Sequence, residues 1–281
     1  MAYLPLRTVG LPEATDRLAD AWLASVEERL GAPDADWYRL ARDLLFEIWY
    51  PGAGDYEALV ENPATPAATR LALLSLDPRN VTLEPEYYAD VDAERYARLK
   101  PLHWLWQSFD RSPLGGGNVH LAVRFRRLLA RHLFARCGRN FKCFQFVEFS
   151  YGYNLEVGDD CVVHRHVLLD DRGGIVLGDR VSISDYANIY SHTHSIVDQK
   201  DVTNARTVLE DDVRITYHAT VLAGVRVGRN GMVGASAVAT KNVRPYHVNV
   251  GIPAKSIRIK PNAPPEVYVT ERVAQREPTE G

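Results

Sequence analysis

Aliphatic residues recur every six positions between Val157 and Arg244. An alternating strand repeats every two residues and an amphipathic helix about every 3.6, so neither explains this period. Four places after each aliphatic residue stands a small or β-branched residue, such as Cys161, Ala187 or Thr193. Two inward positions in every six predict short strands wound into a stacked coil, a β-helix. The predicted inward aliphatic residues are Val157, Val163, Leu169, Leu177, Ile183, Ile189, Leu209, Ile215, Val221, Val227, Val233 and Ala239.

The six-residue count breaks at two places. Two extra residues lie between Leu169 and Leu177, and fourteen beyond the expected six lie between Ile189 and Leu209. Because extra residues in a solenoid must leave the coil, the second break predicts a protruding arm over roughly residues 195–207. Two histidines stand just before this arm, in the stretch from Tyr190 to His194. Loops on a rigid scaffold often carry functional residues, so this stretch is a candidate site.

The chain before the β-helix follows helical spacing instead. Leu18, Trp22, Val26 and Leu30 fall on one stripe, which is typical of an amphipathic helix. Helices are predicted over residues 18–30, 37–48, 65–76, 92–106 and 118–136. We therefore divide the chain into a helical N-terminal extension (1–85), a helical cap with a connecting helix (86–138), the β-helix (139–260) and a C-terminal tail (261–281).

Composition narrows the class of protein. With 281 residues, of which 46% are hydrophobic, the chain can bury a full core. A formal net charge of −3 argues against nucleic acid as the main partner. No segment has the pattern of a secretory signal or of a membrane span. The three cysteines, Cys137, Cys143 and Cys161, are few and odd in number, which favours reduced thiols and a cytoplasmic location.

Three stretches resemble the maltose and galactoside O-acetyltransferases, which are hexapeptide-repeat acyltransferases. The first, Leu128 to Asp171, contains a YG-x-N-hydrophobic-x-VG run like that at the entry to their β-helix. The second, NIYSHTHS from Asn188 to Ser195, is similar to the segment that holds their catalytic histidine. The third, Gly224 to Arg258, ends in G-x-PAK-x-x-R like their coenzyme A-binding end. The resemblance implies a mainly β fold, a left-handed parallel β-helix preceded by a helical N-terminal region.

The resemblance also implies roles for residues near the arm. The family's catalytic histidine falls on His194, and His192 is the rival, with a role in acceptor contact or in structural hydrogen bonding. Imidazole suits the task because it can accept the proton of a hydroxyl that attacks a thioester. The family's acceptor-binding aspartate falls on Asp171, or on Asp170 if the alignment slips by one.

Two positions depart from the family pattern. His164 stands where the family has an acceptor-binding asparagine, and Arg214 stands where it usually has tryptophan. Both departures predict an acceptor that differs from that of the relatives. The alternative for His164 is an outward corner residue in solvent.

For acetyl-CoA as co-substrate the resemblance implies backbone contacts at Tyr217, Ala235 and Thr240, with the Tyr217 amide as the oxyanion donor. Lys241, Lys255 and Arg258 would meet the phosphates, because an extended anion needs cations spaced along its length. Family members are trimers with active sites between two β-helices, so we expect a homotrimer. No metal is required by this chemistry.

Three functions follow as hypotheses. The leading one is an acetyl-CoA-dependent O-acetyltransferase acting on a hydroxyl of a saccharide, glycoside or glycolipid. The second is a metal-dependent hydratase of the γ-carbonic anhydrase kind, which needs three converging histidines; His164, His166, His192 and His194 are enough in number but lack that family's spacing. The third is a non-enzymatic β-helix scaffold.

Overall fold

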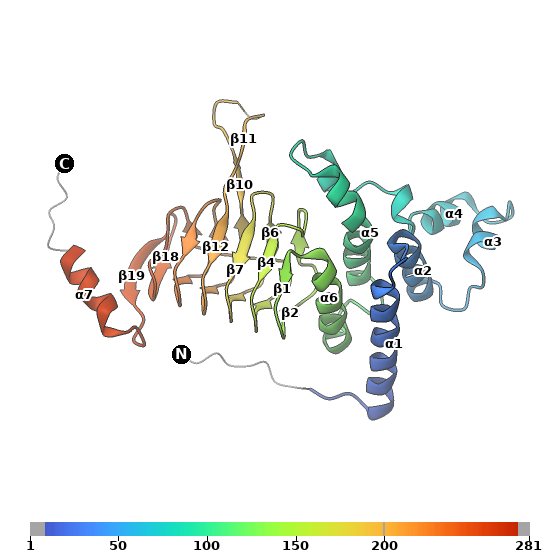
Figure 1. Cartoon of the computed structure of the whole chain (residues 1–281), viewed down its shortest axis with the longest axis horizontal. Helices are drawn as coiled ribbons and strands as arrows, with labels where there is room; N and C mark the ends of the chain where they lie inside the picture. Colours follow the sequence, from blue (N-terminus) through green and yellow to red (C-terminus); the bar gives the residue numbers. More distant parts are fainter. Residues whose placement is uncertain (1–8, 199, 275–281) are drawn as a thin grey trace.

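The computed structural model describes residues 9–198 and 200–274. The described chain is elongated, with a bundle of helices at one end and a β-helix that runs away from it (Figure 1). The helices are α1 (Glu13–Gly31), α2 (Trp37–Trp49), α3 (Tyr56–Glu61), α4 (Ala67–Leu74), α5 (Ala93–Asp110), α6 (Val119–Leu133) and α7 (Pro265–Ala274), with short 3-10 turns η1 (Pro78–Asn80) and η2 (Glu84–Tyr87).

Polar residues fix where several of these helices begin. Asp36, Asp55, Asp92 and Asn118 each accept a hydrogen bond from a backbone N–H in the first turn of the helix that follows. Such caps satisfy donors that have no partner within the helix. The helix predicted over residues 92–106 is α5, which continues through Pro101 to Asp110.

The β-helix consists of three sheets of parallel strands, the second of which ends in one antiparallel strand. The first sheet contains β1 (Arg136–Cys137), β4 (Leu155–Val157), β7 (Ile175–Leu177), β12 (Thr207–Leu209) and β15 (Arg226–Val227). The second contains β2 (Lys142–Cys143), β5 (Val162–Val163), β8 (Ser182–Ile183), β13 (Arg214–Ile215), β16 (Met232–Val233), β18 (His247–Val250) and β19 (Lys255–Ile259). The third contains β3 (Glu148–Phe149), β6 (Leu168–Asp170), β9 (Asn188–Tyr190), β14 (Thr220–Val221) and β17 (Val238–Ala239). The predicted fold class is confirmed.

The register of the second sheet gives the length of each coil. Lys142 pairs with Val162, twenty residues later, and Val162 pairs with Ser182. Ser182 pairs with Arg214, thirty-two residues later, and Arg214 with Met232, only eighteen later. Eighteen residues are three repeats of six. The longer coils carry their additional residues at the turn from the third sheet to the first, which we call the third–first corner (residues 150–154, 171–174, 191–206, 222–225 and 240–242).

The predicted inward residues form the core of the β-helix. Each of the twelve aliphatic positions from Val157 to Ala239 is at most 1% exposed. The small residues of the repeat are buried at the corners, including Cys161, Ala187 and Ala219 at 0%. Two of them are exceptions: Gly173 is only partly buried, and Thr193 lies exposed in the arm and not in a coil. The period of six therefore identifies the core directly from the sequence.

The helical region packs on the open end of the β-helix. Helix α6 lies against β1 and β2, and one continuous hydrophobic core joins residues from α1 through to the last coils. The indole N–H of Trp106 donates to the carbonyl of Val147 at 2.8 Å. Buried Arg126 pairs with buried Asp110, and Asp110 also accepts from the backbone N–H of Phe146 at 2.6 Å. Helices and first coil thus form one packed unit.

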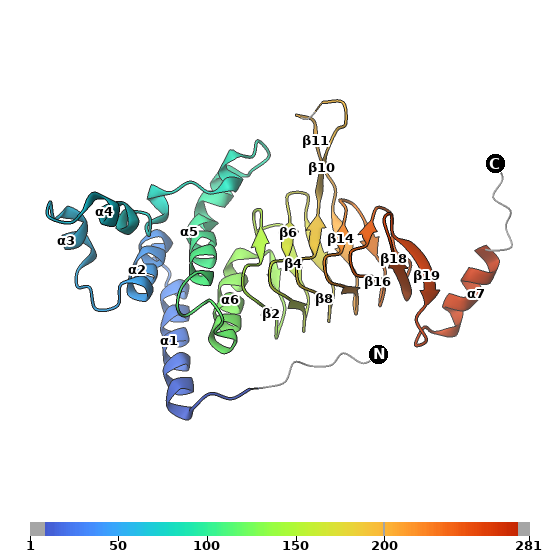
Figure 2. The same ribbon diagram turned by 180° about the vertical axis from the view of Figure 1, so that it is seen from behind.

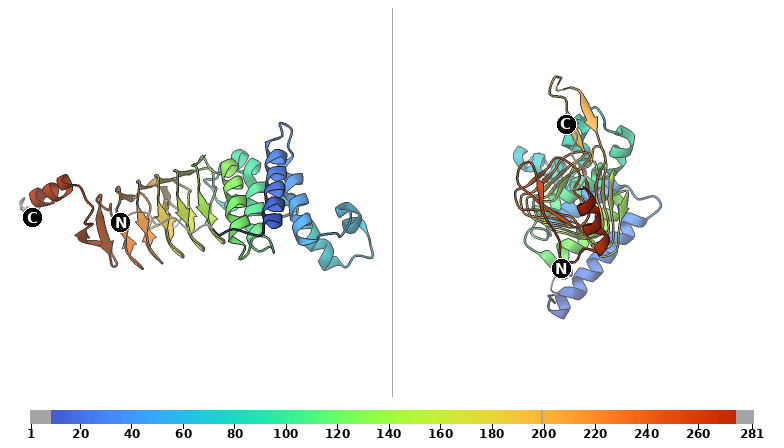
Figure 3. Two further views of the ribbon diagram at one scale, coloured as in Figure 1. Left: turned by 90° about the horizontal axis from the view of Figure 1, so that it is seen from below. Right: turned by 90° about the vertical axis from the view of Figure 1, so that its left-hand side faces the viewer.

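The arm is a two-stranded antiparallel hairpin of β10 (His192–His194) and β11 (Val202–Asn204). It projects from the side of the β-helix, as the view along the long axis shows (Figure 3, right). The arm thus begins at His192, three residues earlier than predicted, so both histidines belong to it. At the other end of the coil β19 runs antiparallel to β18, and α7 lies in the C-terminal tail. Within the described residues, no helix has the length and apolar character to cross a bilayer.

Candidate active site

Two buried hydroxyl side chains hold the base of the arm. Ser191 is fully buried, and its hydroxyl donates to the backbone carbonyl of Asp170. Thr207 is also fully buried; its hydroxyl donates to the carbonyl of Tyr190 at 2.6 Å and accepts from the N–H of Gly224 at 3.0 Å. These two residues close the coil beneath the arm. The arm therefore leaves the coil directly after Ser191.

His192 is fixed by a carboxylate at the base of the arm. Its Nδ1 hydrogen-bonds to Oδ2 of Asp170, whose other oxygen accepts from the hydroxyl of Ser150 at 3.0 Å. The His192 side chain is 18% exposed and that of Asp170 is 4% exposed. Because a carboxylate accepts, Nδ1 carries the proton, and in the neutral ring Nε2 keeps its lone pair. The orientation of this imidazole is therefore set by the coil below it.

His194 lies two residues further along the same strand, so its side chain is on the same face of β10 as that of His192. The two rings meet edge to face, with centroids 5.2 Å apart and planes at 82°. His194 is exposed, whereas His192 is largely covered. The structure thus brings the two candidate histidines together, with the outer one accessible to a substrate.

Asp171, predicted to contact an acceptor, is turned away from the surface. It is fully buried, and its two carboxylate oxygens accept from the backbone N–H groups of Tyr151 at 2.7 Å and Asn154 at 3.2 Å. Burial raises the pKa of Asp171 to about 7 despite these hydrogen bonds. Asp171 therefore holds the corner of the coil, whereas the carboxylate beside the histidines is that of Asp170, the alternative position in the alignment.

His164 lies at a different corner from the arm. It belongs to the turn from the second sheet to the third, the second–third corner (residues 144–147, 164–167, 184–187, 216–219 and 234–237). Its ring stacks on Phe144 with centroids 5.0 Å apart, and burial lowers its pKa. His164 is half-buried in this stack and not freely solvated. Tyr217 and Ala235 lie exposed in the same row of corners.

The remaining predicted coenzyme residues are exposed and lie on two other parts of the surface. Thr240 and Lys241 are at the third–first corner, beyond the arm along the axis. Lys255 and Arg258 are in β19, at the C-terminal end of the second sheet. Arg214 is exposed in β13. Within one chain the predicted site residues therefore do not converge on one cavity.

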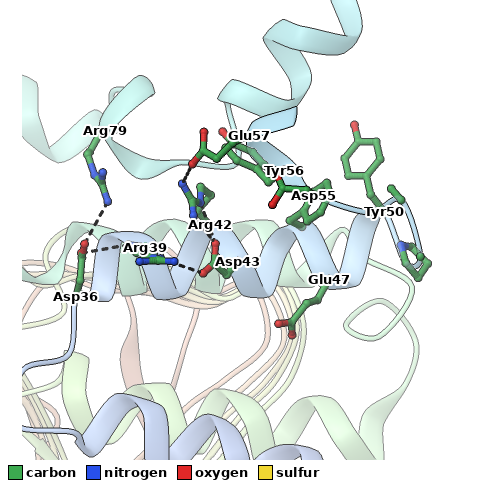
Figure 4. Close-up of a pocket in the computed structure, with 15 residues that line it drawn as sticks. Asp36, Arg39, Arg42, Asp43, Glu47, Tyr50, Asp55, Tyr56, Glu57 and Arg79 are labelled. Atoms are coloured by element: carbon green, nitrogen blue, oxygen red, sulfur yellow. Dashed lines mark hydrogen bonds and ion pairs between the residues drawn. The ribbon is translucent and has the colours of Figure 1, made fainter. Parts of the chain in front are cut away.

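An open groove is present in the helical region, between α2 and the segment from Tyr50 to Glu57 (Figure 4). Its charged side chains are largely engaged with one another: Arg42 pairs with Asp43 and Glu57, and Arg79 with Asp36. None of the predicted site residues lines this groove. We therefore place the candidate active site at the arm.

A zinc site would need several ligand side chains that converge within residues 9–198 and 200–274. No group of three or more His, Cys, Asp or Glu side chains in these ranges is arranged to hold an ion. The four histidines considered for a zinc site are divided between two corners, His164 and His166 at one and His192 and His194 at the other.

Comparisons with known proteins connect this geometry to a class of enzymes. The chain is 27% identical to the galactoside O-acetyltransferase of Escherichia coli K12 over 140 residues, which cover 48% of this chain and 69% of the relative. It is 26% identical to the serine acetyltransferase of Buchnera aphidicola over 43% of this chain and 46% of the relative. No protein-family model matches the chain.

Among solved structures, a hexapeptide-repeat acetyltransferase from Vibrio cholerae in complex with acetyl-CoA aligns with a TM-score of 0.52 and 23% identity. The alignment covers 65% of this chain and 98% of that one, and it shows a shared fold. The two relatives confirm the predicted resemblance to the acetyltransferases and the prediction that the chain is an acyltransferase, and the solved structure shows the shared fold.

Proposed function

We propose that the chain transfers an acetyl group from acetyl-CoA to a hydroxyl of a saccharide, glycoside or glycolipid, with His194 as the general base. The observation that carries this proposal is the pair of histidines on one face of the arm. His192 is bound to Asp170, while His194 beside it is exposed. A general base must be oriented, and it must be accessible to the incoming hydroxyl. His194 is accessible, whereas His192 is largely covered.

The proton path is simple. Nε2 or Nδ1 of His194 accepts the proton of the acceptor hydroxyl as its oxygen attacks the thioester carbonyl. A backbone amide, which we assign to Tyr217, donates to the oxyanion of the tetrahedral intermediate. When the carbon–sulfur bond breaks, the imidazolium returns the proton to the sulfur, which leaves as the free thiol of coenzyme A. His192 and Asp170 keep His194 in place through the edge-to-face ring contact.

A trimer brings the parts of this site together. In one chain the histidines lie at the third–first corner, and His164, Tyr217 and Ala235 lie at the second–third corner. A convex coil offers no cavity for a coenzyme and an acceptor on either corner alone, whereas two β-helices side by side form a cleft. We propose that the arm of one subunit faces the second–third corner of its neighbour, with the pantetheine chain between them and Lys241, Lys255 and Arg258 near the phosphates.

The relatives and His164 support the class of acceptor that we propose. A galactoside O-acetyltransferase is among the relatives, which supports a sugar hydroxyl. Serine acetyltransferases are among them too, so serine belongs in an acceptor panel. His164, which stacks on Phe144, places an imidazole at the position where the family pattern has an asparagine amide. An exchange of hydrogen-bonding groups at such a place changes which hydroxyl compound is accepted more than how tightly coenzyme A binds.

The test is release of coenzyme A thiol from acetyl-CoA across a panel of glycosides, glycolipid headgroups and serine. His194→Ala should lower kcat by roughly 10²–10⁴-fold, as expected for loss of a general base. Thr193→Ala is the matched control, because Thr193 is exposed on the opposite face of the same strand. If His194→Ala stays within a few-fold of the parent while His192→Ala loses activity, the base is His192, oriented by Asp170. If neither matters, the arm is not the active site.

A further inference from the structure

The face of the arm that carries the histidines has a second anchor. In the register of the hairpin, Asn204 of β11 is directly opposite His192 of β10. Side chains directly opposite one another in an antiparallel pair lie on the same face, so Asn204 and His192 are neighbours across the strands. His192 is held from below by Asp170. Asn204 is held from the side, by Asp90 of the helical region.

Asp90 connects three segments that are far apart in the chain. Its carboxylate accepts from the amide of Asn204 at 2.9 Å. It also accepts from Arg172 of the β-helix corner, at 2.7 Å from Nη2 and 3.2 Å from Nε, and from the Tyr151 hydroxyl at 3.0 Å. The Arg172 side chain is 7% exposed, and its guanidinium lies over the ring of Tyr88, 4.4 Å from the centroid. We call Asp90, Arg172 and Asn204 the clamp.

The clamp is charged under ordinary conditions. Burial alone would raise the pKa of Asp90, but the hydrogen bonds from Arg172, Asn204 and Tyr151 lower it to about 2. A two-point hydrogen bond between guanidinium and carboxylate is directional and strong. Asp90 precedes α5, and one end of α5 rises on the same side of the molecule as the arm (Figure 2). The helical region is therefore placed to hold the arm from beside it.

The arm needs such support because it is a small hairpin. Its strands have three residues each, and Ile196 and Val197 near its tip are almost fully exposed. A two-stranded hairpin without a covered face is at best marginally stable alone. Asp170 fixes one strand of the arm and Asp90 the other, so loss of either anchor frees the histidine face to shift.

We propose that Asp90 is a positioning residue, through which the helical region, by way of Asn204, holds the histidine arm in its working position. This inference rests on the proposed function of His194, and it gives the helical cap (86–138), to which Asp90 belongs, a part in the reaction. A misplacement of about 1 Å can cost on the order of 10²-fold in rate. The clamp should therefore act on kcat.

The first experiment removes the contact from the arm alone. Asn204→Ala leaves the Asp90–Arg172 pair intact and should lower kcat by roughly tenfold or more, while KM for acetyl-CoA stays within about twofold, since a shifted base affects the chemical step. Two controls should stay near the parent. Thr203→Ala changes the exposed neighbour on the opposite face of β11. Arg95→Gln removes a bond between the helical region and the β-helix, to the carbonyl of Tyr153 at 3.1 Å, that does not involve the arm.

A rescue pair separates positioning from general damage. Asp90→Asn and Asn204→Asp should each lower kcat, the second by placing two carboxylates together. The double variant restores an amide-to-carboxylate hydrogen bond with the roles exchanged and should recover a substantial part of the rate. A double variant no better than the worse single one would overturn the proposal.

Hydrogen exchange provides a readout independent of activity. The amides of Ser195 and Ala205 close the arm by bonding to the carbonyls of Asp201 and Ser191. Both should exchange faster in Asn204→Ala than in Thr203→Ala. Unchanged exchange, or faster exchange with unaltered kcat, contradicts a positioning role for the clamp. If His194→Ala is fully active, the function proposed for His194 fails, whereas the exchange result still decides whether Asp90 holds the arm.

Discussion

Asp170 and Asp171 are neighbours in the chain with opposite surroundings. Asp170 ends β6 and binds His192, whereas Asp171 enters the corner and accepts two backbone N–H groups. The sequence identifies the pair but does not separate the two residues, because this corner contains extra residues whose path depends on the coil below. Asp171 is the residue that turns into the corner because its carboxylate accepts from the N–H groups of Tyr151 and Asn154, twenty and seventeen residues earlier.

A change of Asp171 should alter how stability depends on pH. Burial raises the pKa of Asp171 from 3.8 to about 7, so the folded state binds the proton more tightly than the unfolded state. The group therefore stabilises the fold below about pH 4, and this contribution is lost as pH rises to about 7. At 1.36 kcal/mol per unit the loss is up to roughly 4 kcal/mol.

Asp171→Asn removes this titration. The difference in free energy of unfolding between the variant and the parent should change in favour of the variant from pH 4 to pH 7 and stay level above that. Denaturant titrations at several pH values measure it. A difference that is flat across pH 4–7 would mean that Asp171 is ionised throughout, held by its two N–H donors.

The histidine pair and Asp170 could be found from the sequence, but the clamp that holds the other strand of the arm could not. His192 and His194 stand out because they adjoin the break in a regular count. Asp90 and Arg172 have no such signal: they are eighty-two residues apart and meet through the packing of η2 and α5 on the third–first corner. A local pattern reports on residues within one coil, and contacts between distant elements depend on how those elements dock.

At the scale of elements, the helical region is joined to the β-helix by a buried ion pair. Arg126 of helix α6 is 1% exposed and binds Asp110 of α5, which is 3% exposed. Arg126 also donates to the carbonyl of Cys143 in β2 at 3.1 Å. One guanidinium thus connects two helices and the first coil. Periodicity alone cannot show this, because Asp110 approaches from another helix.

Removal of Arg126 should destabilise the protein strongly. Arg126→Met leaves Asp110 buried without its cation, a situation that typically costs about 3–5 kcal/mol. Arg131→Met is the control in the same helix, since Arg131 pairs with Glu27 on the surface, where both side chains are more than half exposed, and such pairs contribute about 0–1 kcal/mol. Urea unfolding followed by circular dichroism compares the two. Equal losses would show that burial of the Arg126–Asp110 pair does not matter to stability.

In the molecule as a whole, the repeating coils are the part of the fold that the sequence predicts. A solenoid contacts itself at a fixed separation along the chain, so a repeat in the sequence is also a repeat in space. For this reason the twelve inward positions and the fold class followed from the count of six. The ends of the solenoid do not repeat. One is covered by α6 and the other by antiparallel β19, and neither arrangement has a periodic signal.

The residues of the candidate site lie at two different corners of the β-helix. This separation allows a test of whether two subunits contribute to each active site. His194 lies at the third–first corner and Ala235 at the second–third corner. We assume that each site combines the arm of one subunit with the second–third corner of the next. His194→Ala then removes the base from every arm, and Ala235→Trp fills the proposed coenzyme groove at every second–third corner. Each homotrimer should then be nearly inactive.

Mixed trimers of the two variants should regain activity. Every mixed trimer with cyclic symmetry contains one site built from an intact arm and an intact corner. Random assembly of equal amounts of the two variants makes about three quarters of the trimers mixed. Each mixed trimer has about one working site out of three, so roughly a quarter of the parent activity should return. Co-expression with two different tags, sequential purification and the thiol-release assay measure this recovery, and light scattering gives the subunit number. Mixed trimers as inactive as the two parents would place the whole site within one subunit, and a monomeric protein would exclude the proposed cleft.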